Sequence, residues 1–134
     1  MKTIEVVAGV ITNDRGLILA VQRGEHSKSY ISKKWEFPGG KIEVGELREE
    51  ALKRELAEEL SVEVHVASLI TTVHHSYPDF HLVMHAYHCT IQSGVVQLTE
   101  HIDSKWLEVA ELSALDWAAA DVPVVEEVQK QINL

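Results

Sequence analysis

The segment from Leu47 to Leu60 constrains the fold of this chain more than any other part. It lacks glycine, proline and β-branched residues and is rich in alanine, leucine, glutamate and basic residues, so it predicts a helix. Leu52, Leu56 and Leu60 recur every four residues and form a narrow apolar stripe on that helix, with Ala51 beside it. The stripe must pack against another layer of the protein, and this turns the charged face of the helix away from that layer.

Three carboxylates share the charged face. Glu55, Glu58 and Glu59 stand at positions i, i+3 and i+4, which lie on one side of a helix. Their oxygens are the ligands that hard cations such as Mg²⁺ or Mn²⁺ prefer. Arg54 stands four residues before Glu58 and can orient that carboxylate. Taken alone, the same run also fits a solvent-exposed acidic face balanced by neighbouring basic residues.

The residues before the helix favour a functional site over a merely exposed face. Gly39 and Gly40 precede Lys41, and Gly45 precedes Glu46. Glycines allow the backbone to approach an anion or a metal closely, and Glu46 adds a carboxylate near the start of the helix. In a metal–phosphate site, metal ions bridge phosphate oxygens, a basic side chain neutralises charge and a carboxylate activates water. The combination predicts a site of this kind.

The remaining elements are predicted from hydrophobic patterning. Runs of β-branched and apolar residues predict strands, and the amphipathic segment that begins at Pro123 predicts a terminal helix. We expect the first two strands to form a hairpin around the turn at 13–16, and the polar segment 24–34 to be a surface loop. This order of elements predicts one mixed α+β sandwich, a single domain over residues 1–134. The expected strands are 4–11, 17–22, 62–73, 81–91 and 104–109, and the expected helices are 47–60 and 123–132.

Charge and cysteine content limit the classes of partner. Twelve basic against 21 acidic residues leave a net charge of -9, which repels nucleic-acid polymers and anionic membranes. A small phosphate substrate stays compatible with this charge, because bound divalent cations reverse the local field. The single cysteine, Cys89, excludes an intramolecular disulfide and is expected to be buried in a strand. With no signal peptide or membrane span visible near the N-terminus, we expect a cytoplasmic protein.

The spacing of these residues resembles the Nudix box. The motif is matched in order by Gly40, five residues, Glu46, seven residues, Arg54-Glu55-Leu56-Ala57-Glu58-Glu59, one residue, Ser61 and Val62. Ser61 departs from the pattern, which has glycine there; a serine that keeps a left-handed conformation costs on the order of 1–2 kcal/mol, but its presence removes no ligand. The similarity extends to 4–23 and 37–41, and to 121–123, which resembles the base-recognition segment of MutT-type members.

The resemblance implies a fold and a reaction. The fold is a Nudix-type α/β/α sandwich with a central mixed sheet. The MutT-type and CTP-pyrophosphohydrolase branch, to which the chain is most similar, implies hydrolysis of a nucleoside triphosphate to the monophosphate and pyrophosphate. The implied cofactor is Mg²⁺ or Mn²⁺, and water attacks the β-phosphorus. The expected assembly is a monomer or a homodimer.

The resemblance also implies roles for individual residues. A later-loop acid often approaches the metals in this branch, and Glu100 has the matching place in the order, although it also fits an ordinary exposed loop acid. Arg54 would hold the carboxylates, Glu46 would lie outside direct coordination, and Arg23 and Lys41 would face the phosphates. The implied metal ligands are the Gly39 carbonyl, Glu55, Glu58, Glu59 and Glu100, and the implied catalytic groups are Arg54 with these four glutamates.

Asp121 bears most on the choice of base. An ionised aspartate only accepts hydrogen bonds, and cytosine offers an exocyclic amine donor, so a (deoxy)cytidine or modified pyrimidine triphosphate fits directly. An 8-oxoguanine nucleotide would suit Asp121 if the carboxyl were protonated or paired with a backbone donor. Asp121 could instead only cap the terminal helix. Phe37, Tyr77 and Phe80 are candidates for stacking on the base, or alternatively core residues.

Two other classes of function stay open at the level of sequence. One is hydrolysis of another nucleoside diphosphate derivative, such as a nucleotide sugar or ADP-ribose. The other is a Nudix-like module that binds a nucleotide without cleaving it, although the retention of all the box carboxylates argues against this class. The histidines at 81, 85 and 88 do not have the spacing of a zinc site, and we expect them to be structural.

Overall fold

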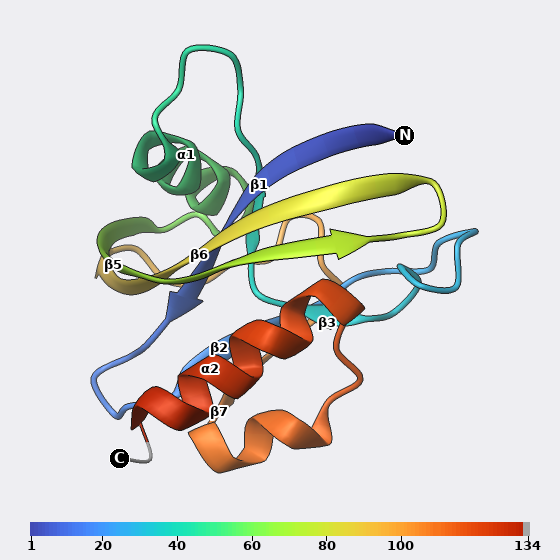
Figure 1. The fold of residues 1–134 in the computed structure, drawn as a ribbon. Coiled ribbons are helices and arrows are strands. Elements are labelled where there is room, and N and C mark those ends of the chain that lie inside the picture. Colours follow the sequence, from blue (N-terminus) through green and yellow to red (C-terminus); the bar gives the residue numbers. More distant parts are fainter. Residues whose placement is uncertain (133–134) are drawn as a thin grey trace.

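The computed structural model describes residues 1–132, in which two α-helices and seven strands are arranged around a mixed sheet (Figure 1). Two short 3-10 helices, η1 and η2, precede the terminal helix. The elements in chain order are β1 (Lys2–Ile11), β2 (Ile18–Gln22), β3 (Trp35–Glu36), β4 (Gly39–Lys41), α1 (Arg48–Leu60), β5 (Glu63–Ser76), β6 (Phe80–Ser93), β7 (Asp103–Leu107), η1 (Val109–Ala114), η2 (Ala119–Asp121) and α2 (Val122–Ile132).

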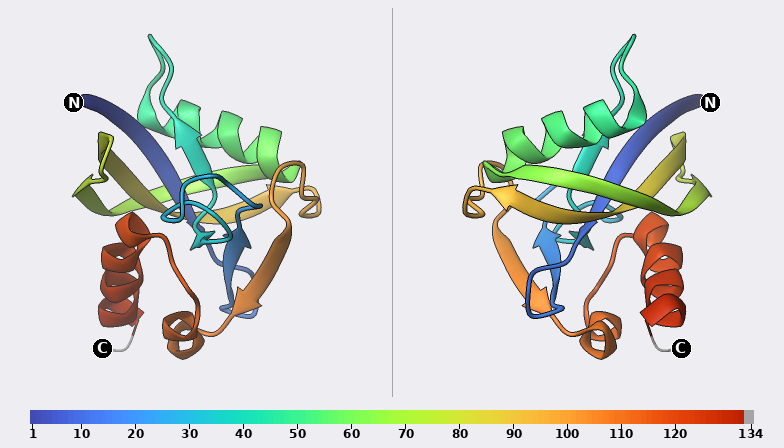
Figure 2. Two further views of the ribbon diagram at one scale, coloured as in Figure 1. Left: turned by 90° about the vertical axis from the view of Figure 1, so that its right-hand side faces the viewer. Right: turned by 90° about the vertical axis from the view of Figure 1, so that its left-hand side faces the viewer.

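The strands form two sheets. The larger sheet has the order β4-β1-β6-β5, with β1 and β6 parallel and the other neighbours antiparallel, and the smaller antiparallel sheet has the order β3-β2-β7. Helix α1 lies on one face of the larger sheet, and α2 lies on the opposite side together with the smaller sheet (Figure 2). The predicted α/β/α sandwich with a central mixed sheet is therefore confirmed, with a second small sheet in addition.

The predicted hairpin between the first two strands is wrong. Strands β1 and β2 belong to different sheets, and only one isolated bridge, between Thr12 and Ile18, joins them. Strand β1 pairs along its whole length with β6, and β4 occupies part of its other edge. The turn itself is present, because the Asn13 side chain accepts hydrogen bonds from the backbone N–H groups of Arg15 and Leu17. The chain uses this turn to pass from one sheet to the other.

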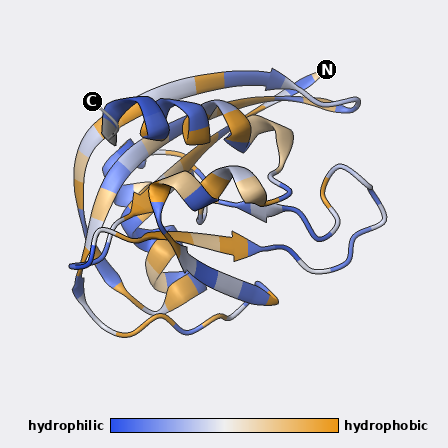
Figure 3. Cartoon of the chain, turned by 90° about the horizontal axis from the view of Figure 1, so that it is seen from below, coloured by the Kyte–Doolittle hydropathy of each residue, from blue (hydrophilic) through white to orange (hydrophobic). Residues whose placement is uncertain are grey.

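Two apolar cores lie on the two faces of the larger sheet. On one face, the predicted stripe of Leu52, Leu56 and Leu60 is fully buried against the sheet. Cys89 is buried there too, as expected, and burial raises the pKa of its thiol to about 12. On the other face, α2 shows alternating hydrophobic and hydrophilic bands (Figure 3), and Val124 belongs to its buried side. Within residues 1–132, no helix is long and apolar enough to cross a membrane.

The ends of α1 follow the sequence closely. The helix begins at Arg48, where the Glu50 carboxylate accepts a hydrogen bond from the Leu47 N–H at 2.9 Å. Its last turn is closed by the N–H of Ser61, which donates to the Ala57 carbonyl at 3.1 Å. Ser61 has φ 59° and ψ 36°, the left-handed conformation that the motif reserves for glycine. The serine therefore keeps the turn that ends the helix, although a left-handed conformation is less favourable for serine than for glycine.

Candidate active site

Arg54 holds the carboxylates of the motif in place. Its guanidinium makes a bidentate contact with Glu46, from Nε at 2.7 Å and from Nη2 at 2.9 Å, and Nη1 donates to Glu55 at 3.0 Å and to Glu58 at 3.4 Å. Nη2 also donates to the Lys41 carbonyl. These contacts lower the pKa of Glu46 to about 2. Among the glutamates of the motif, Arg54 thus contacts Glu46, Glu55 and Glu58.

Glu55 lies against β4, where only glycine leaves room for it. A Cβ on Gly40 would overlap the Glu55 carboxylate, and a Cβ on Gly39 would overlap the backbone of β1. The two glycines therefore bring strand and carboxylate into close approach. Burial raises the pKa of Glu55, and the Arg54 guanidinium partly offsets the shift.

Glu59 is the most buried carboxylate of the helix. Only 7% of the residue is exposed, and its Oε2 has no hydrogen-bond partner within residues 1–132. Burial, followed by the charges of Glu36, Glu55 and Glu100, raises the pKa of Glu59 to about 8. A buried carboxylate oxygen without a partner costs free energy, which a bound cation would recover.

The loop before β7 brings Glu100 to the same place. Thr99 ties the loop to the end of α1 by hydrogen bonds to the Glu58 and Glu59 carbonyls, and Ile102 N–H donates to Gln22 at the end of β2. Glu100 thereby lines a small depression, which we call the carboxylate cavity. Its other lining residues are Arg23, Gly24, Glu25, His26, Ile31, Glu36, Glu59 and His101.

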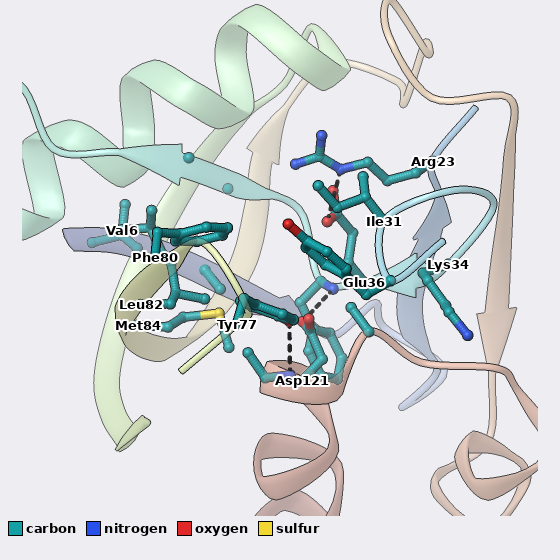
Figure 4. A pocket seen from close by; sticks show the side chains of 18 residues that line it. Val6, Arg23, Ile31, Lys34, Glu36, Tyr77, Phe80, Leu82, Met84 and Asp121 are labelled. Carbon is teal, nitrogen blue, oxygen red and sulfur yellow. Dashed lines mark hydrogen bonds and ion pairs between the residues drawn. The ribbon is translucent and has the colours of Figure 1, made fainter. Parts of the chain in front are cut away.

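A second depression, the aromatic cavity, lies beside the first and shares Arg23, Ile31 and Glu36 with it. Figure 4 shows its walls, formed by side chains of β1, β6, η2 and the 24–34 loop. The rings of Tyr77 and Phe80 lie 5.1 Å apart in its wall. Gly39 and Gly40 also line it, so the cavity reaches the strand that carries the carboxylate site.

The 24–34 loop covers this cavity rather than standing free in solvent. Tyr30 stacks on Tyr77, with ring centroids 5.1 Å apart and planes inclined by 19°. Lys28 and Tyr30 both contact Asp79 in the turn between β5 and β6. Phe37, a sequence candidate for stacking, is 3% exposed and packs on Trp117 at 4.7 Å, so its ring belongs mainly to the core.

Asp121 lies at the base of the aromatic cavity (Figure 4). Its Oδ1 accepts a hydrogen bond from the Phe37 N–H at 3.0 Å, so the carboxyl makes a tertiary contact. Burial, with the charge of Glu36 adding to it, raises the pKa of Asp121 well above its usual range. The ionised form that the sequence reasoning assumed is therefore disfavoured. The neutral carboxyl can both donate and accept a hydrogen bond.

Lys41 is the sequence candidate that the structure leaves apart from the others. Its side chain is exposed, and it is not among the residues that line either cavity. Conversely, the sequence reasoning missed Glu36, which lies between the two cavities and contacts Arg23 and His101. Glu36 was visible in the sequence as a lone carboxylate between two aromatic residues, Trp35 and Phe37.

The donor set fits a hard divalent cation. Glu59 lies near the backbone of Gly39 and near the charges of Glu55 and Glu100, and its Oε2 is buried without a hydrogen-bond partner in residues 1–132. In residues 1–132, no three acidic, histidine or cysteine side chains already converge on one point as ligands. Oxygens of Glu55 and Glu58 are turned to Arg54 instead. Direct coordination by Glu55 and Glu58 would therefore require their carboxylates to turn away from the guanidinium.

An acidic helix whose carboxylates contact Arg54 thus lies beside a cavity lined by Arg23, and this combination suits a substrate that carries phosphate groups together with a divalent cation. The NUDIX domain model matches residues 2–128. The chain belongs to the Nudix family, and it is a Nudix hydrolase.

Individual relatives span nearly the whole chain. The CTP pyrophosphohydrolase of Escherichia coli is 34% identical over 126 residues, covering 94% of this chain and 91% of that protein. The 8-oxo-dGTP diphosphatase of the same organism is 30% identical over 130 residues, covering 97% and 99%. Among solved structures, the E. coli ORF135 protein superposes with a TM-score of 0.84 at 35% identity, covering 98% of this chain and 92% of that one.

Proposed function

We propose that this Nudix hydrolase cleaves nucleoside triphosphates to the monophosphate and pyrophosphate, with a preference for (deoxy)cytidine or modified pyrimidine triphosphates. The observation that carries the proposal is the position of Asp121, whose carboxyl lies in a cavity that also contains Arg23 and the glycines of β4. A base at Asp121 would place its phosphates toward Arg23 and the carboxylate cavity.

Mg²⁺ or Mn²⁺ is the cofactor that this donor set suits. Glu55, Glu58 and Glu59 would hold it, with the Gly39 carbonyl and Glu100. When bound, such a cation neutralises phosphate charge and lowers the pKa of a coordinated water. The chain's own contribution would be orientation: Arg54 would hold Glu46, Glu55 and Glu58 in place, and Arg23 would direct its terminal nitrogens to the phosphates.

The neutral form of Asp121 is compatible with a cytosine base. A protonated carboxyl can donate its O–H to the ring nitrogen N3 and accept from the exocyclic amine, while Oδ1 keeps the Phe37 hydrogen bond. Tyr77 and Phe80 supply apolar rings in the wall, one face of which would cover the base. The relative named CTP pyrophosphohydrolase supports this choice.

An 8-oxo-dGTP sanitising activity is the second candidate. Two observations favour it: the raised pKa of Asp121 and the hydrogen bond that its carboxyl accepts from the Phe37 N–H. An 8-oxoguanine base offers both donors and acceptors, and it suits Asp121 when the carboxyl is protonated or is paired with a backbone donor. Several relatives carry that activity in their names. Both candidates share the same reaction and the same metal site, and they differ only in the base.

A nucleotide panel distinguishes them. Release of nucleoside monophosphate, pyrophosphate and orthophosphate would be measured with dCTP, CTP, 5-methyl-dCTP, 8-oxo-dGTP, dATP, dTTP and a nucleotide sugar, each with and without Mg²⁺. We expect Mg²⁺-dependent pyrophosphate release, fastest with a cytidine nucleotide. A clear lead for 8-oxo-dGTP would replace the first candidate by the second, and cleavage confined to the nucleotide sugar would overturn both. Nucleotide binding without cleavage would show a binding module instead.

A further inference from the structure

His101 lies in the wall of the carboxylate cavity and is nearly inaccessible, with 4% of its side chain exposed. Its Nε2 lies 2.9 Å from Oε2 of Glu36. The loop that carries it is fixed at both ends, by Thr99 to the end of α1 and by Ile102 to β2. The backbone on both sides of His101 is therefore anchored by contacts that do not involve the imidazole ring.

Glu36 has both carboxylate oxygens engaged. Oε2 faces His101, and Oε1 accepts a hydrogen bond from Nε of Arg23 at 3.1 Å. Figure 4 shows the Arg23 guanidinium over the Glu36 carboxylate, with its terminal nitrogens directed away from it. Within the described residues, those terminal nitrogens have no hydrogen-bond partner. The three side chains thus form a chain of contacts that ends in two free donor groups.

The anchoring matters because Arg23 is otherwise unrestrained. Its side chain is 53% exposed, and a long exposed side chain loses rotamer entropy when it is fixed. A guanidinium contacts a phosphate through two parallel hydrogen bonds only when its plane is oriented for them. If Glu36 were free to rotate, the loss of rotamer entropy on ordering Arg23 would have to be offset by the free energy of nucleotide binding.

We propose that His101 is a positioning residue, which through Glu36 holds the Arg23 guanidinium toward the phosphates of the bound nucleotide. This role rests on the proposed function and deepens it, because it assigns part of the binding of the phosphate chain to a residue outside the Nudix box. It concerns nucleotide binding and leaves the hydrolytic step to the carboxylate helix.

The unpartnered nitrogen of His101 argues against a purely structural role. Nδ1 is buried and has no hydrogen-bond partner within residues 1–132. Buried polar atoms in folded proteins almost always have a partner, and an apolar side chain at this position would avoid the cost of leaving one unpaired. Packing alone therefore gives no reason for a histidine here, whereas the contact of Nε2 with Glu36 does.

Two substitutions of His101 distinguish the effect of its contact with Glu36 from the effect of its side-chain volume. In H101Q, the amide nitrogen can take the place of Nε2 and donate to Glu36; in H101N, the amide lies near the place of Nδ1 and falls short of it. We expect H101N to raise KM for the preferred triphosphate about tenfold, the scale of one charge-assisted hydrogen bond, with kcat within about threefold. H101Q should restore KM to near the wild-type value.

His88 provides the matched control. It is a histidine of β6 that also contacts its partner through Nε2, with Gln131 at 3.0 Å, away from both cavities. H88N should leave KM and kcat unchanged. If H101N loses kcat at unchanged KM, or if H101Q is as impaired as H101N, His101 does not act by positioning Arg23, and the proposal is wrong.

A second measurement does not depend on turnover. The Nε–Hε resonance of Arg23, one of four arginines in the chain and assigned by its loss in R23K, should be observable and slow to exchange in the wild-type protein and in H101Q. It should broaden or disappear in H101N. An unchanged resonance in H101N would overturn the positioning role even if no triphosphate were cleaved, so failure of this proposal and failure of the proposed function remain distinguishable. Should H101N not fold, E36Q tests the same contacts, and an unperturbed Arg23 resonance in E36Q would equally contradict the proposal.

Discussion

The Glu55 carboxylate occupies the space in which a side chain on residue 40 would lie. This relationship explains why a glycine stands at position 40. Gly40 does not need an unusual backbone conformation, but a side chain there would overlap the Glu55 carboxylate. We therefore expect G40A to displace Glu55 and lower Mg²⁺-dependent kcat/KM by about 10- to 100-fold, the range for disturbing a metal-site group.

G9A is the matched control for that substitution. Gly9 lies in β1, and its added Cβ would meet the side chain of Leu56 at 3.1 Å, in the core beneath the same helix. The crowding should lower the free energy of unfolding by about 1–3 kcal/mol but leave Glu55 in place. If G9A and G40A lost activity equally, general disturbance of α1 rather than the position of Glu55 would be the cause.

Glu58 and Glu59 of α1 should be indispensable for turnover. We expect E58Q and E59Q each to lower kcat by at least about 100-fold, and removal of divalent cations with EDTA to abolish activity that added Mg²⁺ or Mn²⁺ restores. E49Q, which changes an exposed glutamate in the first turn of the same helix, is the control and should keep wild-type turnover. Wild-type kcat in E59Q would remove this residue from the site.

Glu59 should make the metal-free protein less stable as pH rises. Burial raises its pKa in the folded protein to about 8, from an ordinary value of 4.5, so between these two values the folded state keeps a proton that the unfolded state has lost. Stability from this group is complete below pH 4.5 and declines as pH rises toward 8. In EDTA, the E59Q variant should therefore lose less unfolding free energy than the wild type between pH 5 and 8, by on the order of a few kcal/mol. Urea denaturation at the two pH values would measure it, and parallel losses in the two proteins would contradict the assignment.

The left-handed conformation of Ser61 should measurably lower the free energy of unfolding. Ser61 keeps this conformation at the end of α1, which glycine adopts freely. We expect S61G to increase the free energy of unfolding by about 1 kcal/mol and to leave the metal site untouched. S68G, at an exposed position within β5, should instead be destabilising. A decrease in stability in S61G would mean that the serine side chain makes a contribution that its geometry does not reveal.

Asp121 should determine which base is preferred and should take no part in the hydrolytic step. D121N keeps one donor and one acceptor, as the neutral carboxyl has, whereas D121L keeps neither. D121N should retain kcat/KM for the preferred nucleotide within about threefold, and D121L should lose about 10- to 100-fold, the scale of one or two buried hydrogen bonds. The nucleotide panel measured with both variants checks this. Equal activity of D121L across the panel would limit Asp121 to a structural role.

The sequence by itself determined the carboxylate helix and the chemistry that belongs to it. Its extent follows from the helix propensity of its residues. Its buried leucine stripe and the shared face of Glu55, Glu58 and Glu59 follow from helical periodicity, which depends only on neighbours three and four residues apart. The contact of Arg54 with Glu58 was predictable for the same reason. Glu46, eight residues from Arg54, was anticipated through the motif and not through local geometry.

Only the tertiary structure decided which strands and side chains surround that helix and the two cavities. Pairing between β1 and β6 joins residues almost eighty positions apart, and this pairing took β1 away from the hairpin that local patterning suggested. The pKa of Asp121 is raised by its burial and by the charge of Glu36, and is partly lowered again by the hydrogen bond from the Phe37 N–H; both residues are more than eighty positions away in the sequence. The contacts from His101 through Glu36 to Arg23 likewise unite three distant segments. Local sequence cannot encode such encounters, because they result from the packing of whole layers and from the desolvation that packing imposes on each carboxylate.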